Sequence, residues 1–337
     1  MVLFNHHYDK KVIFMKKRFL TQVCLVGLFS LLFFSCITDE DPIKGKFPTV
    51  PVNFEAVNSE YDDYNSASPY ELYYEFPFVF SSNRKSQGGN FDFVNYIAYY
   101  YYNTSQKLFY LDVYEGSYWF LDSAMVKVNS DFNEYGPLFI DVDYSKVLLM
   151  YSNDSSGNLD LYYSLSSLGE WQSPKKINSV NSNYNEAYQC FNKSGTKMYF
   201  CSDSTGNFDI YYITLPESTP ILNWIQSSEK LTWENHAASN SSADDKCPYI
   251  NGNLMVFTSN REGGYGGYDL YYSIYENKTW SDPVNFGPEI NSEYDEYRPL
   301  TAYVYDYKND LMIFSSNRPG GLGGFDLYYV GIPKMTD

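Results

Sequence analysis

The stretch Ser315–Tyr329, SSNRPGGLGGFDLYY, decides the fold of this chain. A short apolar segment, Leu311–Phe314, precedes it, and an aromatic and β-branched segment follows its glycines. Both segments are typical of strands. The glycines between them suit backbone positions with positive φ, and the Asn and Asp side chains can bond neighbouring amides. The stretch therefore predicts a β-hairpin. Apolar residues on both parities of its first strand predict a sheet covered on both faces.

Copies of this hairpin recur along the chain. A near copy, TSNREGGYGGYDLYY, spans Thr258–Tyr272, and three weaker copies lie upstream. Repeats of this kind, with strand-like segments throughout, predict a β-propeller. Aligned on a Ser-Asn or Ser-Asp step, the five copies place the Asn or Asp at Asn83, Asn153, Asp203, Asn260 and Asn317. A second Asp, interpreted as structural, recurs downstream at Asp92, Asp160, Asp209, Asp269 and Asp326.

Each repeat is predicted to hold four strands. After the hairpin come a Trp-Pro strand, as in Lys278–Phe286, and an Asn-Ser turn with acids, as in Asn291–Glu296. The fifth repeat lacks its Trp-Pro strand, but Pro51–Tyr64 copies Pro283–Tyr297 and is expected to supply it. We therefore predict an all-β, five-bladed propeller of four-stranded blades over residues 51–337, closed by an N-terminal strand that completes the last blade.

Composition narrows the function. The chain has 37 Tyr and 24 Phe, which suits many short strands, and these rings either pack between strands or form a sugar-stacking surface. A formal charge of −17 argues against nucleic acid as a partner. Cys190, Cys201 and Cys247 are an odd number without CxxC spacing, so we expect buried small hydrophobes instead of a disulfide framework or zinc site.

Residues 1–36 have the features of a signal peptide. Met15, the expected true start, opens a basic Met-Lys-Lys-Arg segment, and Phe19–Phe34 is mostly apolar. Leu32–Cys36 places a small residue before a cysteine, which resembles the cleavage box of bacterial lipoproteins, although Phe33 stands where Leu is more usual. An uncleaved membrane anchor is the alternative.

The lipoprotein resemblance implies that Cys36 becomes the lipid-modified N-terminus and attaches the protein to a membrane. Residues 37–50 then form an acidic and polar tether. This tether resembles the surface-export signal of Bacteroidota lipoproteins, or it serves as a solvated linker. The expected location is the outer membrane, on its periplasmic or its exposed side.

The Ser-Asn-Arg, Gly-Gly and Asp-Leu-Tyr-Tyr pattern resembles the TolB-like β-propeller repeat of Bacteroidota lipoproteins and extends from Pro51 to Ile332. The resemblance implies a propeller that acts as a binding platform or scaffold. The expected partner is a protein or a glycan of the cell envelope.

Blade topology predicts one candidate ligand face. The loop between the second and third strands opens on the same face as the connection into the next blade, so Gly-rich hairpins and acidic turns share it. Either each Arg pairs with a nearby acid and each recurring Asp caps its own turn, or the carboxylates bind a polar ligand or a cation, for which calcium fits the oxygen ligands. The candidate residues are Arg84, Arg261, Arg318, Glu134, Glu186, Asp245 and Glu296, with Asp62 or Asp63 in the first blade.

The sequence contains few of the catalytic residues that common enzyme classes need. His236 is the one histidine after residue 36, which argues against a Ser-His-Asp triad or a histidine-rich metal site. The Gly-rich hairpins lack the helix of a phosphate-binding loop. Our first hypothesis is a non-enzymatic, lipid-anchored binding propeller, with no catalytic residue assigned. The alternative is a five-bladed glycoside hydrolase or lyase that uses carboxylates over the channel.

Overall fold

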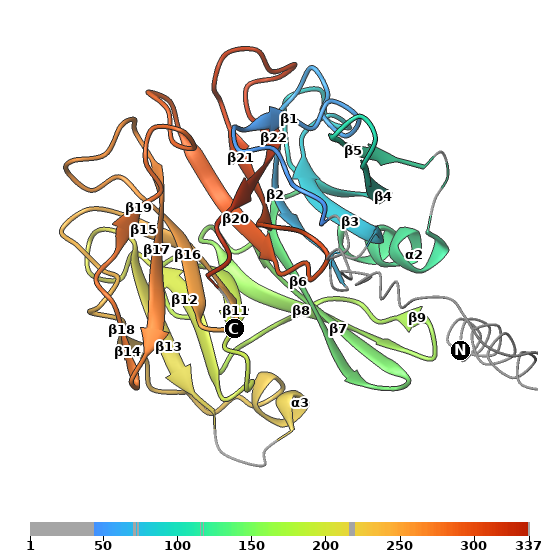
Figure 1. Cartoon of the computed structure of the whole chain (residues 1–337). Helices are drawn as coiled ribbons and strands as arrows, with labels where there is room; N and C mark the ends of the chain where they lie inside the picture. Colours follow the sequence, from blue (N-terminus) through green and yellow to red (C-terminus); the bar gives the residue numbers. More distant parts are fainter. Residues whose placement is uncertain are drawn as a thin grey trace, which may run out of the picture. The chain divides into compact units, whose positions relative to one another are not determined.

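The computed structural model describes residues 44–335, except for 70, 71, 73, 115, 117 and 216–219. The predicted signal peptide, Cys36 and the first part of the predicted tether lie outside the described residues. Five antiparallel sheets are arranged as a five-bladed β-propeller (Figure 1), which confirms the predicted fold class. No helix in this part of the chain is long and apolar enough to cross a membrane.

The strands of each blade follow chain order from the channel outward. Blade 1 contains β2 (Asp63–Ala67), β3 (Glu75–Ser82), β4 (Asp92–Asn103) and β5 (Leu108–Val113). Blade 2 contains β6 (Glu134–Asp143), β7 (Lys146–Asn153), β8 (Asp160–Ser167), β9 (Glu170–Trp171) and β10 (Lys175–Lys176). Blade 3 contains β11 (Glu186–Phe191), β12 (Lys197–Ser202), β13 (Asp209–Thr214) and β14 (Glu234–Asn235). Blade 4 contains β15 (Asp245–Asn251), β16 (Leu254–Ser259), β17 (Asp269–Glu276), β18 (Thr279–Trp280) and β19 (Val284–Asn285). Blade 5 contains β20 (Glu296–Ala302), β21 (Asp310–Ser316), β22 (Asp326–Ile332) and β1 (Val52–Asn53).

The N-terminal strand closes the ring. In β1, Val52 pairs with Tyr329 and Asn53 with Tyr328 on β22. The backbone N–H of Phe54 then donates to the Leu327 carbonyl at 2.9 Å. Because β1 covers the outer edge of β22, the last blade is completed as predicted.

The outer edge of blades 2 and 4 differs from the single Trp-Pro strand that we expected. In blade 4, β18 pairs with the end of β17, and β19 pairs with its middle. Pro283 lies between the two short strands. Proline has no N–H to donate to the ladder, so the strand is interrupted there. Pro174 occupies the same place between β9 and β10.

Strand pairing also corrects the alignment of the second repeat. Ser82 pairs with Asp92 in blade 1, whereas Asn153 pairs with Asp160 in blade 2. The position equivalent to Asn83 is therefore Asp154, one residue beyond the predicted Asn153. Alignment on the Ser-Asn step selected the wrong residue because blade 2 ends its second strand with an Asn.

An asparagine before each inner strand ties that strand's blade to the preceding one. Asn291, for example, accepts the N–H of Leu270 at 2.9 Å and donates its amide to the Leu270 carbonyl at 3.0 Å. Such a pair satisfies both backbone groups of one buried residue. The equivalent asparagines are Asn58, Asn129, Asn181 and Asn240.

Insertions fill three grooves between neighbouring blades. Helix α2 (Trp119–Val128) packs its apolar side chains between blades 1 and 2. Helix α3 (Ile221–Ile225) does the same between blades 2 and 3. Phe47 and Tyr307, stacked with ring centroids 4.1 Å apart, pack between blades 5 and 1. The remaining two grooves, on either side of blade 4, hold cavities.

Candidate functional site

Each inner strand begins with a carboxylate that is fully buried. A serine four positions earlier binds it in every blade: Ser292 donates its N–H to Glu296 Oε2 at 2.9 Å and its hydroxyl to Oε1 at 2.6 Å. A carboxylate without exposed surface cannot contact a ligand unless the turn opens. These acids are Asp63, Glu134, Glu186, Asp245 and Glu296, each with 0% exposure.

The three hairpin arginines pair with these acids inside their own blades. The Nη2 atoms lie 2.6 Å from Asp63 for Arg84, 2.5 Å from Asp245 for Arg261, and 2.8 Å from Glu296 for Arg318. The same Nη2 atoms also donate to backbone carbonyls of the preceding turns. Each arginine therefore holds its hairpin to the inner strand, and its Nε and Nη2 donors are already bonded.

Blades 2 and 3 bury their acid without an arginine. Glu134 accepts hydrogen bonds from Ser130 at 2.6 Å and from Asn153 at 2.8 Å, both neutral donors. Burial raises the pKa of Glu134 to about 8 and also raises the pKa of Glu186. Glu134 is therefore protonated near neutral pH.

The recurring Asp after each Gly-rich hairpin stabilises that hairpin. Asp269 accepts the N–H groups of Tyr265 at 2.7 Å and Gly266 at 3.1 Å, and Asp326 accepts that of Leu322 at 2.6 Å. Within their own hairpins, Asp92, Asp160 and Asp209 bond Lys85, Ser156 and Thr205 respectively. Across the described ranges, no group of three or more His, Cys, Asp and Glu side chains is arranged to hold a metal ion. Calcium binding stays a prediction.

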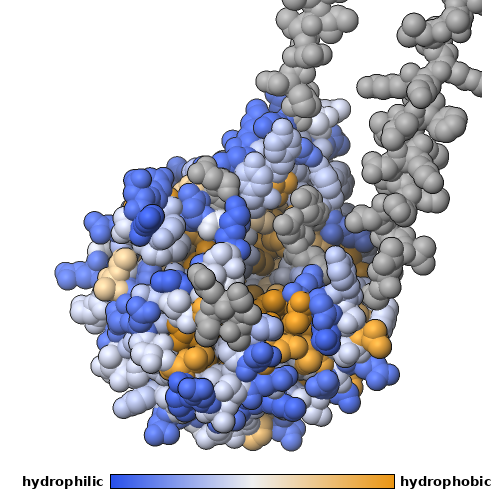
Figure 2. All heavy atoms as spheres, turned by 90° about the horizontal axis from the view of Figure 1, so that it is seen from below, coloured by the Kyte–Doolittle hydropathy of each residue, from blue (hydrophilic) through white to orange (hydrophobic). Residues whose placement is uncertain are grey.

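A cleft of about 840 Å³ lies between blades 3 and 4. Its walls come from the β11–β12, β15–β16 and β17–β18 turns, together with residues 235–238 after β14. These turns lie at the end of the sheets opposite to the Gly-rich hairpins, at the bottom of Figure 1. Figure 2 views the molecule from that side and shows hydrophobic surface near the middle, with hydrophilic residues around it.

Four aromatic side chains line the cleft. Trp280 and Tyr275 lie with ring centroids 5.2 Å apart at its outer edge, and Tyr275 is 44% exposed. Tyr212 and Tyr199 continue the wall inward, with centroids 5.6 Å apart. Aromatic faces beside open space are surfaces on which a ligand can stack.

His236 is the polar centre of this aromatic wall. It is 5% exposed, and its ring packs edge-on against Tyr199 at 5.4 Å and Trp280 at 5.9 Å. Neither ring nitrogen has a hydrogen-bond partner. Burial lowers the pKa of His236 to about 4. The neutral ring therefore has one donor and one acceptor that no described residue uses, and both atoms are shielded from the open part of the cleft.

The charge of the cleft is opposite to that of the chain. Lys193, Lys197 and Lys278 line it together with the amides of Asn192 and Asn253, and none of its lining residues is acidic. Lys197 Nζ lies 3.9 Å from the centroid of the Tyr212 ring. In a chain of net charge −17, this is a locally basic surface.

The sequence did not reveal this cleft, because its walls come from turns far apart in the chain. His236 was identified as the last remaining histidine, but it lay in a long connection with no assigned position. Trp280 was assigned to a packing strand. The aromatic and β-branched pattern specifies strands, and it does not tell which groove between blades stays open.

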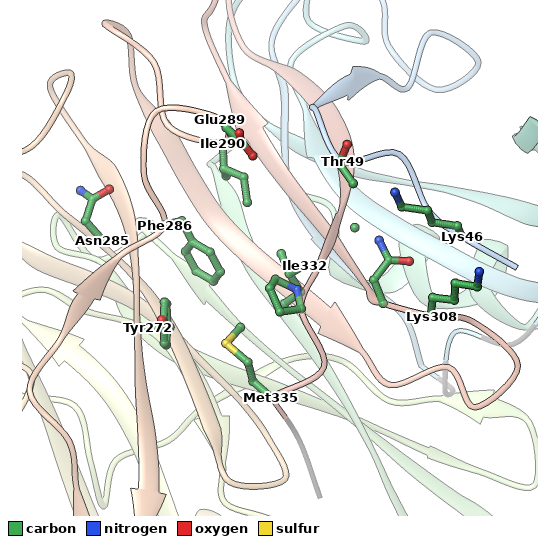
Figure 3. A pocket seen from close by; sticks show the side chains of 13 residues that line it. Lys46, Thr49, Tyr272, Asn285, Phe286, Glu289, Ile290, Lys308, Ile332 and Met335 are labelled. Carbon is green, nitrogen blue, oxygen red and sulfur yellow. The ribbon is translucent and has the colours of Figure 1, made fainter. Parts of the chain in front are cut away.

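A smaller pocket of about 390 Å³ lies in the groove between blades 4 and 5. Figure 3 shows Tyr272, Phe286 and Met335 on one side of it, and Lys46 and Lys308 on the side of the N-terminal segment. Its volume is less than half that of the cleft between blades 3 and 4, and it lacks a buried imidazole.

Comparison with known proteins supports the fold. No family model and no curated protein matches the chain. Among solved structures, an endo-arabinase from Bacteroides thetaiotaomicron is similar with a TM-score of 0.50 at 12% identity, over 85% of this chain and 97% of that one. A GH62 α-L-arabinofuranosidase catalytic domain from Coprinopsis cinerea gives 0.47 at 12% identity, over 86% and 98% of the two chains. A family 117 glycoside hydrolase from Zobellia galactanivorans gives 0.46 at 9%, over 86% and 90%.

These matches correct the family expected from the sequence. Assignment to the TolB-like repeat family is wrong, since no family model matches and the solved structure with a TM-score of 0.50 is an endo-arabinase. The glycines and the recurring Asp that suggested the assignment serve hairpin geometry, which unrelated propellers share. The chain is thus a five-bladed propeller whose fold is similar to that of the endo-arabinase.

Proposed function

We propose that this protein recognises a glycan in the cleft between blades 3 and 4. The observation that carries the proposal is the pair of Tyr275 and Trp280, whose rings lie 5.2 Å apart at the outer edge of an open cleft. Sugar rings have C–H faces that pack on Trp and Tyr, and hydroxyls that need donors and acceptors. Trp280 and Tyr275 supply the first kind of contact, and the exposed hydroxyl and ammonium groups of the lining supply the second.

The lysines narrow the ligand class to acidic glycans. Lys193, Lys197 and Lys278 surround the aromatic wall, and the lining residues contain no carboxylate that would repel an anion. A uronic acid or a sulfated sugar brings both an apolar face and a negative charge. Attraction to the lysines adds selectivity for such units over neutral sugars.

The test is calorimetric titration of the chain without residues 1–36 with a panel of acidic and neutral oligosaccharides. We expect binding of an acidic member, weakened about tenfold or more by Trp280→Ala and by Tyr275→Ala, each of which removes an aromatic face from the cleft. Trp119→Ala, an exposed tryptophan on α2, is the control and should bind as wild type. The proposal fails if no member binds, or if both cleft variants bind unchanged.

Glycan cleavage is the second candidate function. It is supported by the fold shared with the endo-arabinase and by Glu134, whose raised pKa supplies the protonated carboxyl that glycoside hydrolysis needs. It ranks second because Glu134 and Glu186 have no exposed surface. Release of reducing ends from the same panel, abolished by Glu134→Gln or Glu186→Gln, would raise cleavage to first place.

A membrane anchor at Cys36 is a proposal that fits glycan capture at a cell surface. The segment of residues 37–50 would then tether the propeller to the outer membrane. The proposed partner is an envelope glycan. The binding site itself does not depend on the anchor.

A further inference from the structure

A single layer of residues lines the central channel at a bulge in each inner strand. The second residue after each buried acid has positive φ, which is uncommon in residues other than glycine. The strand pairing shifts register at this point in every blade. Because the positions are equivalent, each blade contributes one residue to the layer. The layer consists of Asn65, Gly136, Tyr188, Cys247 and Arg298, with φ of 61°, 58°, 58°, 54° and 50°.

Arg298 is a buried cation without an acidic partner. It is 3% exposed, and none of the ion pairs among the described residues includes it. Its Nη2 reaches across the channel to the Pro137 carbonyl at 3.5 Å, the long limit of a hydrogen bond, while Nε and Nη1 have no partner. The Tyr188 ring, with its centroid 5.6 Å from Cζ, gives partial compensation. The three hairpin arginines, in contrast, all have carboxylates.

The neighbouring layer position also has unused hydrogen-bonding groups. Asn65, in the adjacent blade 1, is fully buried, and both its amide nitrogen and its oxygen lack partners. Cys247 adds no negative charge, because burial raises the pKa of its thiol well above the usual value. Gly136 allows the Tyr188 ring to pack directly against the backbone, since a Cβ there would lie 2.8 Å from that ring.

Aromatic rings lie toward the Gly-rich end of this layer. Tyr64 contacts Tyr135 and Phe325 with ring centroids 5.7 and 5.8 Å apart, and Tyr297 packs beside Tyr188 at 6.3 Å. These rings shield the channel from bulk water. Burying a charge in such surroundings is unfavourable unless the charge is paired and its N–H groups are hydrogen-bonded.

We propose that the channel binds one small monovalent inorganic anion, of the halide class, between the Arg298 guanidinium and the Asn65 amide. One positive charge requires compensation, so a singly charged anion balances the layer. The free N–H groups of Nε, Nη1 and the asparagine amide are donors, which is the chemistry that an anion needs. The site is separate from the cleft and does not depend on the proposed glycan function.

The test uses the chain without residues 1–36. Its melting temperature is measured in sodium chloride and in sodium bromide, and each value is compared with that in sodium gluconate at the same ionic strength. We expect a halide-dependent rise that saturates, as binding to one site requires. Arg298→Met should lose this rise. Arg318→Met is the matched control, because it removes an arginine that already has a carboxylate, and it should keep the rise.

Crystallography with bromide decides the outcome if Arg298→Met fails to fold. We expect an anomalous difference peak within hydrogen-bond distance of Arg298 Nε or Nη1 in the wild-type protein. The proposal is overturned if wild type shows no saturable halide effect, if Arg298→Met keeps it, or if crystals grown in bromide show no peak in the channel.

Discussion

At the scale of single residues, the buried acids at the start of the inner strands form two groups. Three pair with an arginine, and two, Glu134 and Glu186, do not. Glu134 is bound by neutral groups and has a pKa near 8, whereas an unfolded Glu titrates near 4.5. Between these values the unfolded chain releases a proton that the folded chain keeps. The free energy of unfolding therefore falls as pH rises from about 4.5 to 8, and the contribution is fully present only below that window.

The variant Glu134→Gln should remove this pH dependence. A pKa displaced by one pH unit corresponds to about 1.4 kcal/mol. The difference in unfolding free energy between the variant and the wild type should therefore change by at least about 1 kcal/mol from pH 4.5 to 8. The change should favour the variant at pH 8. Urea unfolding at both pH values measures this. Glu262→Gln, at an exposed hairpin position, is the control. Parallel pH curves for Glu134→Gln and wild type would contradict the assignment.

The residues that repeat could be predicted, and those that do not repeat could not. The pairing of each Arg with an acid and the capping by Asp269 were weighed from the sequence as one of two alternatives, because residues shared by most blades serve what all blades need. The roles of His236 and Arg298 depend on which side chains reach them from other blades. A pattern read along one strand does not contain that information.

At the scale of elements, α2 acts as a wedge between blades 1 and 2. Phe120, Leu121, Ala124, Met125 and Val128 face inward, at a spacing typical of an amphipathic helix. We did not expect a helix there, because the surrounding sequence is dominated by strand-forming aromatic residues. The pattern was present, but it covers three turns at most and is easily overlooked among strands.

Truncation of one buried helix residue tests the wedge. Leu121 is fully buried in the cluster that joins blades 1 and 2, so Leu121→Ala should lower the free energy of unfolding by about 2–5 kcal/mol. Val126→Ala lies on the same helix at 81% exposure and should change it by less than about 0.5 kcal/mol. Equal, small effects of both changes in urea unfolding would show that the helix is not part of the core.

At the scale of the whole molecule, the sequence predicts the closed ring of five blades, but it does not predict which groove between blades stays open. Five hairpins and one displaced strand determine the number of blades and the way the ring closes. The groove between blades 3 and 4 is open because no insertion fills it, whereas insertions fill three other grooves. Insertions vary independently of the repeat. The features that all blades share could therefore be predicted from the sequence. The candidate site lies where the insertions make the blades differ.

Ring closure predicts the consequence of removing β1. Phe54 is 1% exposed and lies between Phe78 of blade 1 and Tyr329 of blade 5, with ring centroids at 5.7 and 6.0 Å. A chain that starts after Phe54 loses this contact and the buried Phe47 ring as well, so the loss should be at least about 3–5 kcal/mol, and it exposes the edge of β22 to pairing with another chain. A chain that starts at Lys44 is the control. Urea unfolding should show a lower midpoint for the shorter chain, and size-exclusion chromatography should show self-association. A monomer with an unchanged midpoint would mean that the ring is held closed without β1.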